Sequence, residues 1–283
     1  MNINILQRIQ SSSNDLTKAQ LQVSEYIQDN LVEASFQTLD QIAASIGTST
    51  TTVMRFAFSL GFSGYSELQK ELQKYIRSKL TPESRLEKNT VTVNEDSLKL
   101  KCAEKQIHNI KNTQENLSEE AIYESIQFIK KAKTIFLLGA RTSFTISYFL
   151  YQSFNQQLNN CKLLSPVGQD IDQALNITAD DLMIVISLPR YAKSTIELVK
   201  SIRKLRNPSI ITITDGFAAP LAPYSDIILP CEYDSLSYHN SMSAPLYIAD
   251  LLVTELSQAA KSKTAKRLVD AEELMKLLDY HYE

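Results

Sequence analysis

Glycine, proline and cysteine are scarce in this chain of 283 residues, and tryptophan is absent. Six glycines and eight prolines are too few for a collagen-like, linker-rich or many-turned β architecture. The three cysteines, Cys102, Cys161 and Cys231, form neither a CxxC pair nor a spacing typical of zinc ligands. We therefore expect no metal site and no cofactor. Spare thiols favour a reducing, cytoplasmic compartment over a disulfide-bonded, secreted fold.

Long apolar runs and an excess of positive charge are missing as well. The N-terminal stretch MNINILQRIQSSSND lacks the apolar core of a signal peptide, and no window approaches the roughly 18 apolar residues that cross a bilayer. The net charge of -3 gives no strongly basic field that would indicate a nucleic-acid partner. An apolar content of 43% still allows an ordinary core. We expect a soluble intracellular protein with one to two domains and no membrane contact.

The chain divides into two regions with different sequence patterns. From residue 16 to about residue 77 the pattern is helical, whereas short apolar runs recur after residue 133. These runs span 134–139, 161–165, 181–187, 209–214 and 226–231. Because they are apolar at consecutive positions and are separated by helix-length or loop-length stretches, they predict strands of a parallel sheet buried on both faces.

The resulting fold class is an all-α domain followed by a doubly wound α/β domain with a five-stranded parallel sheet. A polar, charged segment at 81–97 separates the two regions, and two helices at about 98–116 and 118–132 are expected to lead into the first strand. We expect a helical domain over 1–77, a linker over 78–100 and the α/β domain over 101–283.

Capping signals place short helices in the first domain. Two capping boxes are present, Thr17 with Gln20 and Thr38 with Gln41. Gly47 suits the left-handed turn that ends the second of these helices, and Ser49 is placed to cap a third over 50–60. Two short helices joined by a tight turn form a helix-turn-helix by spacing.

The helix over 50–60 has residue types that suit a DNA major groove. Its core side carries Val53, Phe56, Ala57 and Leu60. Short hydroxyl side chains can donate to base edges, and an arginine can reach a guanine or a phosphate. The DNA contacts that we predict are Thr48, Ser49, Thr50, Thr51, Thr52 and Arg55. The spacing of Arg55, Lys70, Lys74 and Arg77 permits a basic edge without requiring one. The same hydroxyl residues also fit a well-capped, solvated helix start.

Residues 38–72 resemble the helix-turn-helix domain of the RpiR/MurR family of bacterial transcriptional regulators. The matching positions are Ala43, Gly47, Ser49, Thr52, Val53, Arg55 and Phe56, followed by Leu60, Gly61, Phe62, Gly64 and Tyr65. The resemblance implies operator DNA as a partner. Helix-turn-helix proteins bind as dimers because one half-site supplies few contacts, so we expect a homodimer or tetramer.

Two strand ends in the second domain carry polar residues suited to an anion. The first strand runs into Gly139, Ala140, Arg141, Thr142 and Ser143, and the third is followed by Ser187, Arg190, Ser194 and Thr195. Ligands of open α/β sheets gather at the carboxyl ends of the strands, and amides at helix starts favour phosphate. The first turn is neither a Walker loop nor a dinucleotide fingerprint, and a plain strand-to-helix turn is the alternative.

The second domain resembles the SIS (sugar isomerase) domain. The matching pieces are the 139–143 turn, the strand ending at Ser187 with the Ser/Thr-bearing helix start after it, residues 211–230, and a final helix after Ser243. The resemblance implies that Ser143, Ser187 and the hydroxyls at 194–195 bind a phosphorylated sugar or amino sugar. Two departures from the family pattern are Arg141 in the first turn and the run 187–191.

We expect a regulator of carbohydrate metabolism and not an enzyme. Isomerisation of a sugar phosphate needs a base, and only His239 lies in a suitable loop, beside Glu232 and Asp234. A DNA-binding domain makes catalysis unnecessary, because a bound metabolite can bias the protein between DNA-binding states through the 78–100 linker. The alternatives are a phosphosugar isomerase with a helical accessory domain and a metabolite sensor that does not bind DNA.

Overall fold

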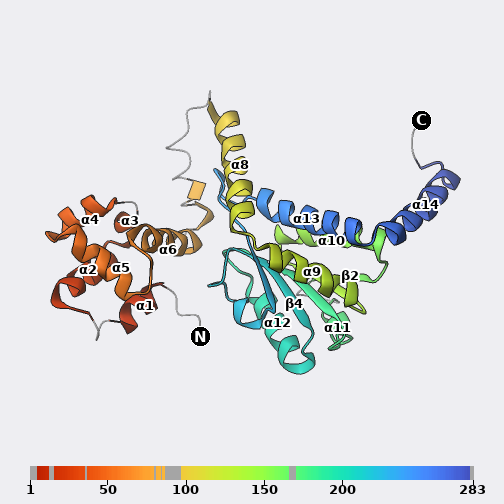
Figure 1. The fold of residues 1–283 in the computed structure, drawn as a ribbon, viewed down its shortest axis with the longest axis horizontal. Helices are drawn as coiled ribbons and strands as arrows, with labels where there is room; N and C mark the ends of the chain where they lie inside the picture. The colour runs from red at the N-terminus through yellow and green to blue at the C-terminus, as the bar shows by residue number, and fades with distance from the viewer. Residues whose placement is uncertain are drawn as a thin grey trace. The chain divides into compact units, whose positions relative to one another are not determined.

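The computed structural model describes residues 5–12, 16–35, 37–79, 81–83, 85–86, 97–165 and 170–280. The chain divides into two compact units, residues 1–84 and 85–283 (Figure 1). The division lies inside the segment 78–100 that we expect to be a linker. Residues 80, 84 and 87–96 of that segment lie outside the described residues.

The first unit is helical. Its helices are α1 (Ile5–Ser11), α2 (Lys18–Asp29), α3 (Leu31–Ala34), α4 (Leu39–Ile46), α5 (Thr50–Ser59) and α6 (Tyr65–Lys79). Both predicted capping boxes are present, with Thr17 and Thr38 accepting from the backbone of the glutamine three residues on. One apolar cluster joins the helices, with Ile27, Phe56 and Leu68 fully buried in it. We did not predict α1 or α3, which have seven and four residues, because so short a helix has little periodic signal.

The second unit is a parallel five-stranded sheet with helices on both faces. The strands are β1 (Ile135–Gly139), β2 (Cys161–Leu164), β3 (Leu182–Ile186), β4 (Ser209–Thr214) and β5 (Ile227–Pro230). The helices are α8 (Leu98–Asn116), α9 (Glu119–Lys131), α10 (Ser143–Gln157), α11 (Asp170–Ala174), α12 (Lys193–Arg206), α13 (Ser243–Ala259) and α14 (Lys261–Leu277). The sheet order β2-β1-β3-β4-β5 confirms the doubly wound fold that the sequence predicts.

Each face of the sheet has its own core. Leu137 and Ile184 pack with α9, α10 and α13 on one face, whereas Phe136 and Met183 pack with α12 on the other. Figure 1 shows α10 and α13 on one side of the strands and α12 on the opposite side. Because both faces are covered, β1 and β3 are buried along their whole length, which explains their uninterrupted apolar sequences.

All three cysteines are free. Cys161 and Cys231 are buried and Cys102 is exposed. Burial raises the pKa of Cys161 to about 12. Of the helices that the structure describes, none has the length and apolar character that crossing a membrane requires.

Candidate functional site

The helix-turn-helix of the first unit consists of α4, a tight turn and α5. Gly47 ends α4 with a left-handed φ of 73°, and the amide of Thr48 donates to the carbonyl of Ala43 at 3.0 Å. Ser49 then caps α5, because its hydroxyl accepts from the amide of Thr52 at 3.2 Å. The hydroxyls of Ser49 and Thr52 also bond to each other at 2.9 Å. These two hydroxyls therefore hold the start of α5 in place.

The two sides of α5 differ as the sequence predicts. Val53, Phe56 and Ala57 are fully buried, which fixes the helix against the core of the first unit. Of the residues that we predict to contact DNA, Ser49, Thr51 and Arg55 are exposed, and Thr48, Thr50 and Thr52 are half-buried. Among the residues whose spacing permits a basic edge, Lys70 is exposed and Lys74 is half-buried, while the side chain of Arg77 lies outside the described residues.

The segment after α5 is held by contacts that the sequence does not reveal. Gly61 has a φ of +78°, and a Cβ there would lie 2.6 Å from Nη2 of Arg8. The Arg8 guanidinium sits over the Phe62 ring at 4.6 Å from its centroid. Ser63 donates from its amide and its hydroxyl to Glu67 at 2.6 and 2.8 Å, and these bonds lower the pKa of Glu67. This segment therefore connects α5 to α6 through a defined turn.

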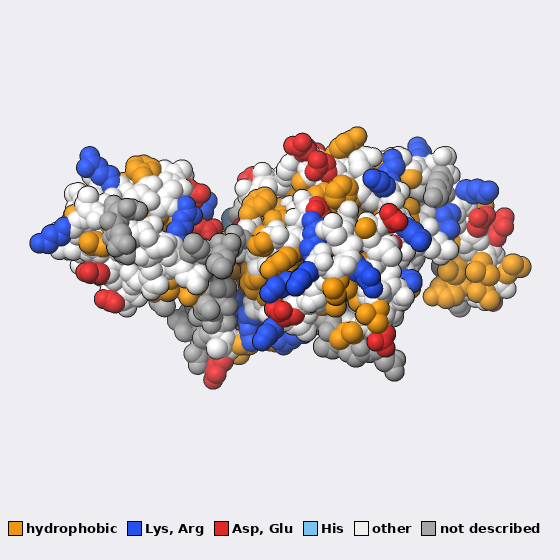
Figure 2. Space-filling view, turned by 90° about the horizontal axis from the view of Figure 1, so that it is seen from below, with side chains coloured by type: hydrophobic (Ala, Val, Ile, Leu, Met, Phe, Trp, Pro, Cys, Tyr) orange, Lys and Arg blue, Asp and Glu red, His pale blue; other side chains and the backbone are white. Residues whose placement is uncertain are grey.

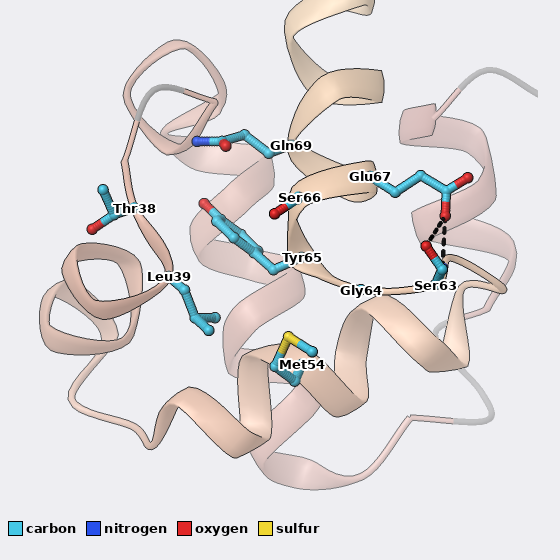
Figure 3. Close-up of a pocket in the computed structure, with 9 residues that line it drawn as sticks. All are labelled: Thr38, Leu39, Met54, Ser63, Gly64, Tyr65, Ser66, Glu67 and Gln69. Carbon is cyan, nitrogen blue, oxygen red and sulfur yellow. Dashed lines mark hydrogen bonds between the residues drawn. The ribbon is translucent and has the colours of Figure 1, made fainter. Parts of the chain in front are cut away.

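A hollow of about 490 Å³ opens beside α5 (Figure 3). It lies where α4 and α6 begin, and Met54 of α5 points toward it. The lining residues are Thr38, Leu39, Met54, Ser63, Gly64, Tyr65, Ser66, Glu67 and Gln69. None of these nine residues is cationic, so the described lining of the hollow lacks the charge that a sugar phosphate requires.

The anion-binding residues that we predict in the second unit follow two neighbouring strands. Strands β1 and β3 pair in parallel, with Gly139 beside Ile186 at their carboxyl ends. From β1 the chain continues to β2 on one side, and from β3 it continues to β4 on the other. The turns at 139–143 and 187–192 therefore meet at the topological switch point, which is where ligands bind in open α/β sheets.

The turn after β1 uses its own helix-start amides. The amide of Ser143 donates to the carbonyl of Ala140, and the amides of Phe144 and Thr145 donate to Arg141 and Thr142, at 3.1 to 3.2 Å. A Cβ on Gly139 would lie 2.6 Å from the carbonyl oxygen of Ser143. Gly139 therefore allows α10 to approach β1 closely, a role that the sequence does not show.

The turn after β3 leaves its helix start open. Ala192, at the start of α12, makes no side-chain capping bond. Thr195 is 1% exposed, and its hydroxyl has no hydrogen-bond partner among the residues that the structure describes. Ser187, 5% exposed, is held through its backbone, since its carbonyl accepts from the Thr214 hydroxyl at 2.6 Å. The first amides of a helix have no partner within the helix, so the start of α12 offers donors to an anion.

Both arginines at the switch point have a left-handed backbone. The φ angles are 55° for Arg141 and 68° for Arg190, and both side chains are exposed. Residues with a side chain rarely adopt this conformation, and such strain concentrates at functional sites. The two departures from the SIS pattern therefore coincide with two strained arginines at the same edge of the sheet.

Residues distant in sequence complete the surroundings of the second turn. Asn240 donates through Nδ2 to the Pro189 carbonyl at 3.0 Å, and the Tyr191 hydroxyl donates to Asp215 at 2.7 Å. We did not predict Asn240 or Asp215, because neither has a motif and only the tertiary fold brings them to residues 187–192. His239 contacts the Asn240 carbonyl through Nδ1 at 2.9 Å.

Comparison with known proteins agrees with this two-part architecture. Residues 3–79 match the helix-turn-helix domain of the rpiR family, and residues 128–255 match the SIS domain. A relative from Haemophilus influenzae is named an uncharacterized HTH-type transcriptional regulator. It is 25% identical over an alignment of 285 positions, gaps included, which covers 93% of this chain and 93% of the relative.

Solved structures share the fold. The sugar isomerase domain of an RpiR transcription factor from Sphaerobacter thermophilus has a TM-score of 0.60 and 21% identity, covering 62% of this chain and 99% of that chain. Vibrio vulnificus NanR, solved in complex with ManNAc-6P, has a TM-score of 0.59 and 18% identity, covering 97% of this chain and 99% of that chain.

Proposed function

Because this chain belongs to the RpiR family, with that family's helix-turn-helix domain followed by a SIS domain, we propose that it binds operator DNA under the control of a phosphorylated sugar. The helix-turn-helix unit reads the operator, and the SIS unit binds the sugar phosphate or amino-sugar phosphate at the switch point of its sheet. An effector changes DNA affinity only if it binds the DNA-competent and incompetent states differently.

The observation that carries the effector site is the uncapped start of α12 with the buried hydroxyl of Thr195. A buried hydroxyl without a partner is costly, and a bound phosphate removes that cost by accepting its hydrogen bond. Ser187 and Ser194 add hydroxyls beside it, and Arg190 adds charge. The turn at 139–143 contributes the charge of Arg141 and the hydroxyls of Thr142 and Ser143. The amides at the start of α10 do not contribute, because they already donate to carbonyls of the turn.

On the DNA side, we assign α5 to the major groove. Arg55 and Thr51 are exposed on it and reach base edges or phosphates, whereas the hydroxyls of Ser49 and Thr52 keep the helix start rigid. A single helix of this kind makes few contacts, so tight binding requires two half-sites and a dimer.

An exposed apolar surface at the end of α14 and just after it supports assembly with a second copy. Leu274, Leu277, Leu278 and Tyr280 are each more than half exposed, and Figure 2 shows hydrophobic side chains gathered at the end of the second unit where α14 lies. Such clusters mark protein contacts. Replacing Leu277 and Leu278 by glutamate is expected to lower the oligomeric state measured by analytical ultracentrifugation.

DNA binding with and without effector tests the function. Fluorescence anisotropy with the DNA upstream of the chain's own gene is measured alone and with a panel of sugar phosphates that includes ManNAc-6P, each matched to its unphosphorylated sugar. We expect DNA affinity to change about 5- to 150-fold with one phosphorylated member and not with its unphosphorylated form. No DNA binding, or turnover of a panel member as in an isomerase, would contradict the proposal.

A further inference from the structure

We propose that Asn240 is a positioning residue that ties the effector loop to the point where the chain enters the second unit. The effector loop is defined as residues 187–192, which follow β3. The inference rests on the proposed function for its biological meaning, but its contacts stand independently. Asn240 donates to the Pro189 carbonyl at 3.0 Å, and its own Oδ1 accepts from Nη1 of Arg85 at 2.8 Å.

Arg85 gives this pair of bonds its significance. It is the first residue of the second unit and lies within the segment that leads from the DNA-binding unit. Arg190, next to Pro189, has the left-handed φ of 68°. One amide side chain thus bonds the strained effector loop through its nitrogen and the entering chain through its oxygen. Movement of the loop on anion binding must stretch one of these bonds or move Arg85.

A second set of contacts anchors the same side of the unit to α8, the first long helix after the entry point. Lys105 pairs with Asp234 at 2.8 Å, and Asn109 donates to the Asp234 carbonyl at 2.7 Å. The Thr113 hydroxyl accepts from the amide of Glu232 at 2.9 Å. The segment 232–240 therefore contacts α8 at its start and the effector loop at its end, so that α8 and Arg85 both respond to the position of that loop.

Hydrogen exchange of the full-length protein, measured by mass spectrometry without any ligand, tests the link first. Asn240→Asp keeps the acceptor for Arg85 but loses the donor to Pro189, whereas Arg85→Ala keeps that donor and removes the guanidinium that bonds to Oδ1 of Asn240. We expect exchange in the effector loop to become about two- to tenfold faster in Asn240→Asp and also faster in Arg85→Ala, the range that one hydrogen bond of ordinary net strength predicts. Arg267→Ala is the matched control, because that arginine donates instead to the carbonyls of Asn155 and Gln156.

Inorganic phosphate then separates this inference from the proposed function. In the wild type, phosphate is expected to slow exchange in residues 187–195 and also around residue 85. In both variants the protection of 187–195 remains, while the protection around residue 85 is lost. Unchanged exchange of the effector loop in both ligand-free variants overturns the inference. Phosphate that protects nothing at 187–195 in the wild type contradicts the effector site instead.

Discussion

Gly139 and Ser147 are so close that a side chain on the glycine would collide with the serine. A Cβ on Gly139 would lie 2.5 Å from the Ser147 hydroxyl oxygen and 2.8 Å from the carbonyl carbon of Ser143. The glycine that opens the 139–143 turn therefore sets the distance between β1 and α10. This packing role accounts for the glycine without requiring contact with a ligand.

We predict that Gly139→Ala destabilises the second unit by about 1–3 kcal/mol, since overpacking a close helix–strand contact forces the backbone apart. Urea unfolding measures the effect. Adding Ser147→Ala removes the hydroxyl oxygen but leaves the backbone of Ser143, so we expect only partial recovery. Full stability of Gly139→Ala alone would show that α10 can shift without cost.

Arg55→Ala is expected to weaken operator binding by about 1–3 kcal/mol, the range for losing an arginine contact to a base. Anisotropy titrations at one fixed salt concentration measure the change. Lys18→Ala is the control, because it removes one exposed positive charge from α2 and leaves α5 intact. Equal loss in both variants would reduce the role of Arg55 to general attraction for phosphate.

Thr195→Val separates a ligand hydroxyl from a structural one. Because the Thr195 hydroxyl is buried and has no partner within the described part of the chain, valine should leave the free energy of unfolding unchanged or raise it by up to about 1 kcal/mol. Affinity for the effector should nevertheless fall about tenfold or more, as expected for a lost bond to an anion. Urea unfolding measures the free energy of unfolding, and titration calorimetry measures the affinity for the effector.

Thr212→Val is the matched control for that substitution. The Thr212 hydroxyl is also buried but bonds to the Ser225 hydroxyl at 2.6 Å. We expect this variant to lose stability and to keep its effector affinity. The opposite pattern, with Thr195→Val binding normally, would remove Thr195 from the anion site.

The buried hydroxyl of Tyr65 should make the folding stability of the first unit fall at alkaline pH. Burial, with a smaller contribution from Tyr26, raises its pKa from 10.0 to about 12, and its hydroxyl donates to the Gln37 carbonyl at 2.9 Å. Since the folded pKa exceeds the unfolded value, the stabilisation is complete below pH 10 and is lost between about pH 10 and 12. The loss amounts to up to about 2–3 kcal/mol. Thermal unfolding against pH measures it.

Tyr65→Phe is the control for this pH dependence. The variant should be less stable at pH 8 by about 0.5–1.5 kcal/mol, because the hydroxyl that donates to the Gln37 carbonyl at 2.9 Å and to the Ala34 carbonyl at 3.2 Å is removed. Gln69 still donates to the Gln37 carbonyl at 2.6 Å, which keeps that acceptor satisfied. The variant should also lose less stability above pH 10. An identical alkaline decline in both proteins would assign the titration to another group.

Local signals in the sequence were sufficient for most secondary structure. Thr38 with Gln41, Gly47 and Ser49 mark helix ends by side-chain chemistry that acts within a few residues, and all three occur as predicted. The buried strands were evident because β1 and β3 are covered on both faces and so are apolar throughout. Helices α1 and α3 lacked such signals, since a single turn or two of helix shows little periodicity.

The sequence alone determined the two architectures and the turns that carry Ser143 and Ser187, because capping, hydrophobic periodicity and uninterrupted apolar runs are local properties. The tertiary structure decided what surrounds those turns. Asn240 lies 51 residues from Pro189, and Arg85 lies 155 residues from Asn240, yet each pair is hydrogen-bonded. Such partners have no mutual spacing in the sequence. The parallel pairing of β3 with β4 and of β4 with β5 puts the ends of β3 and β5 at one edge of the sheet, and only this tertiary arrangement brings such partners together.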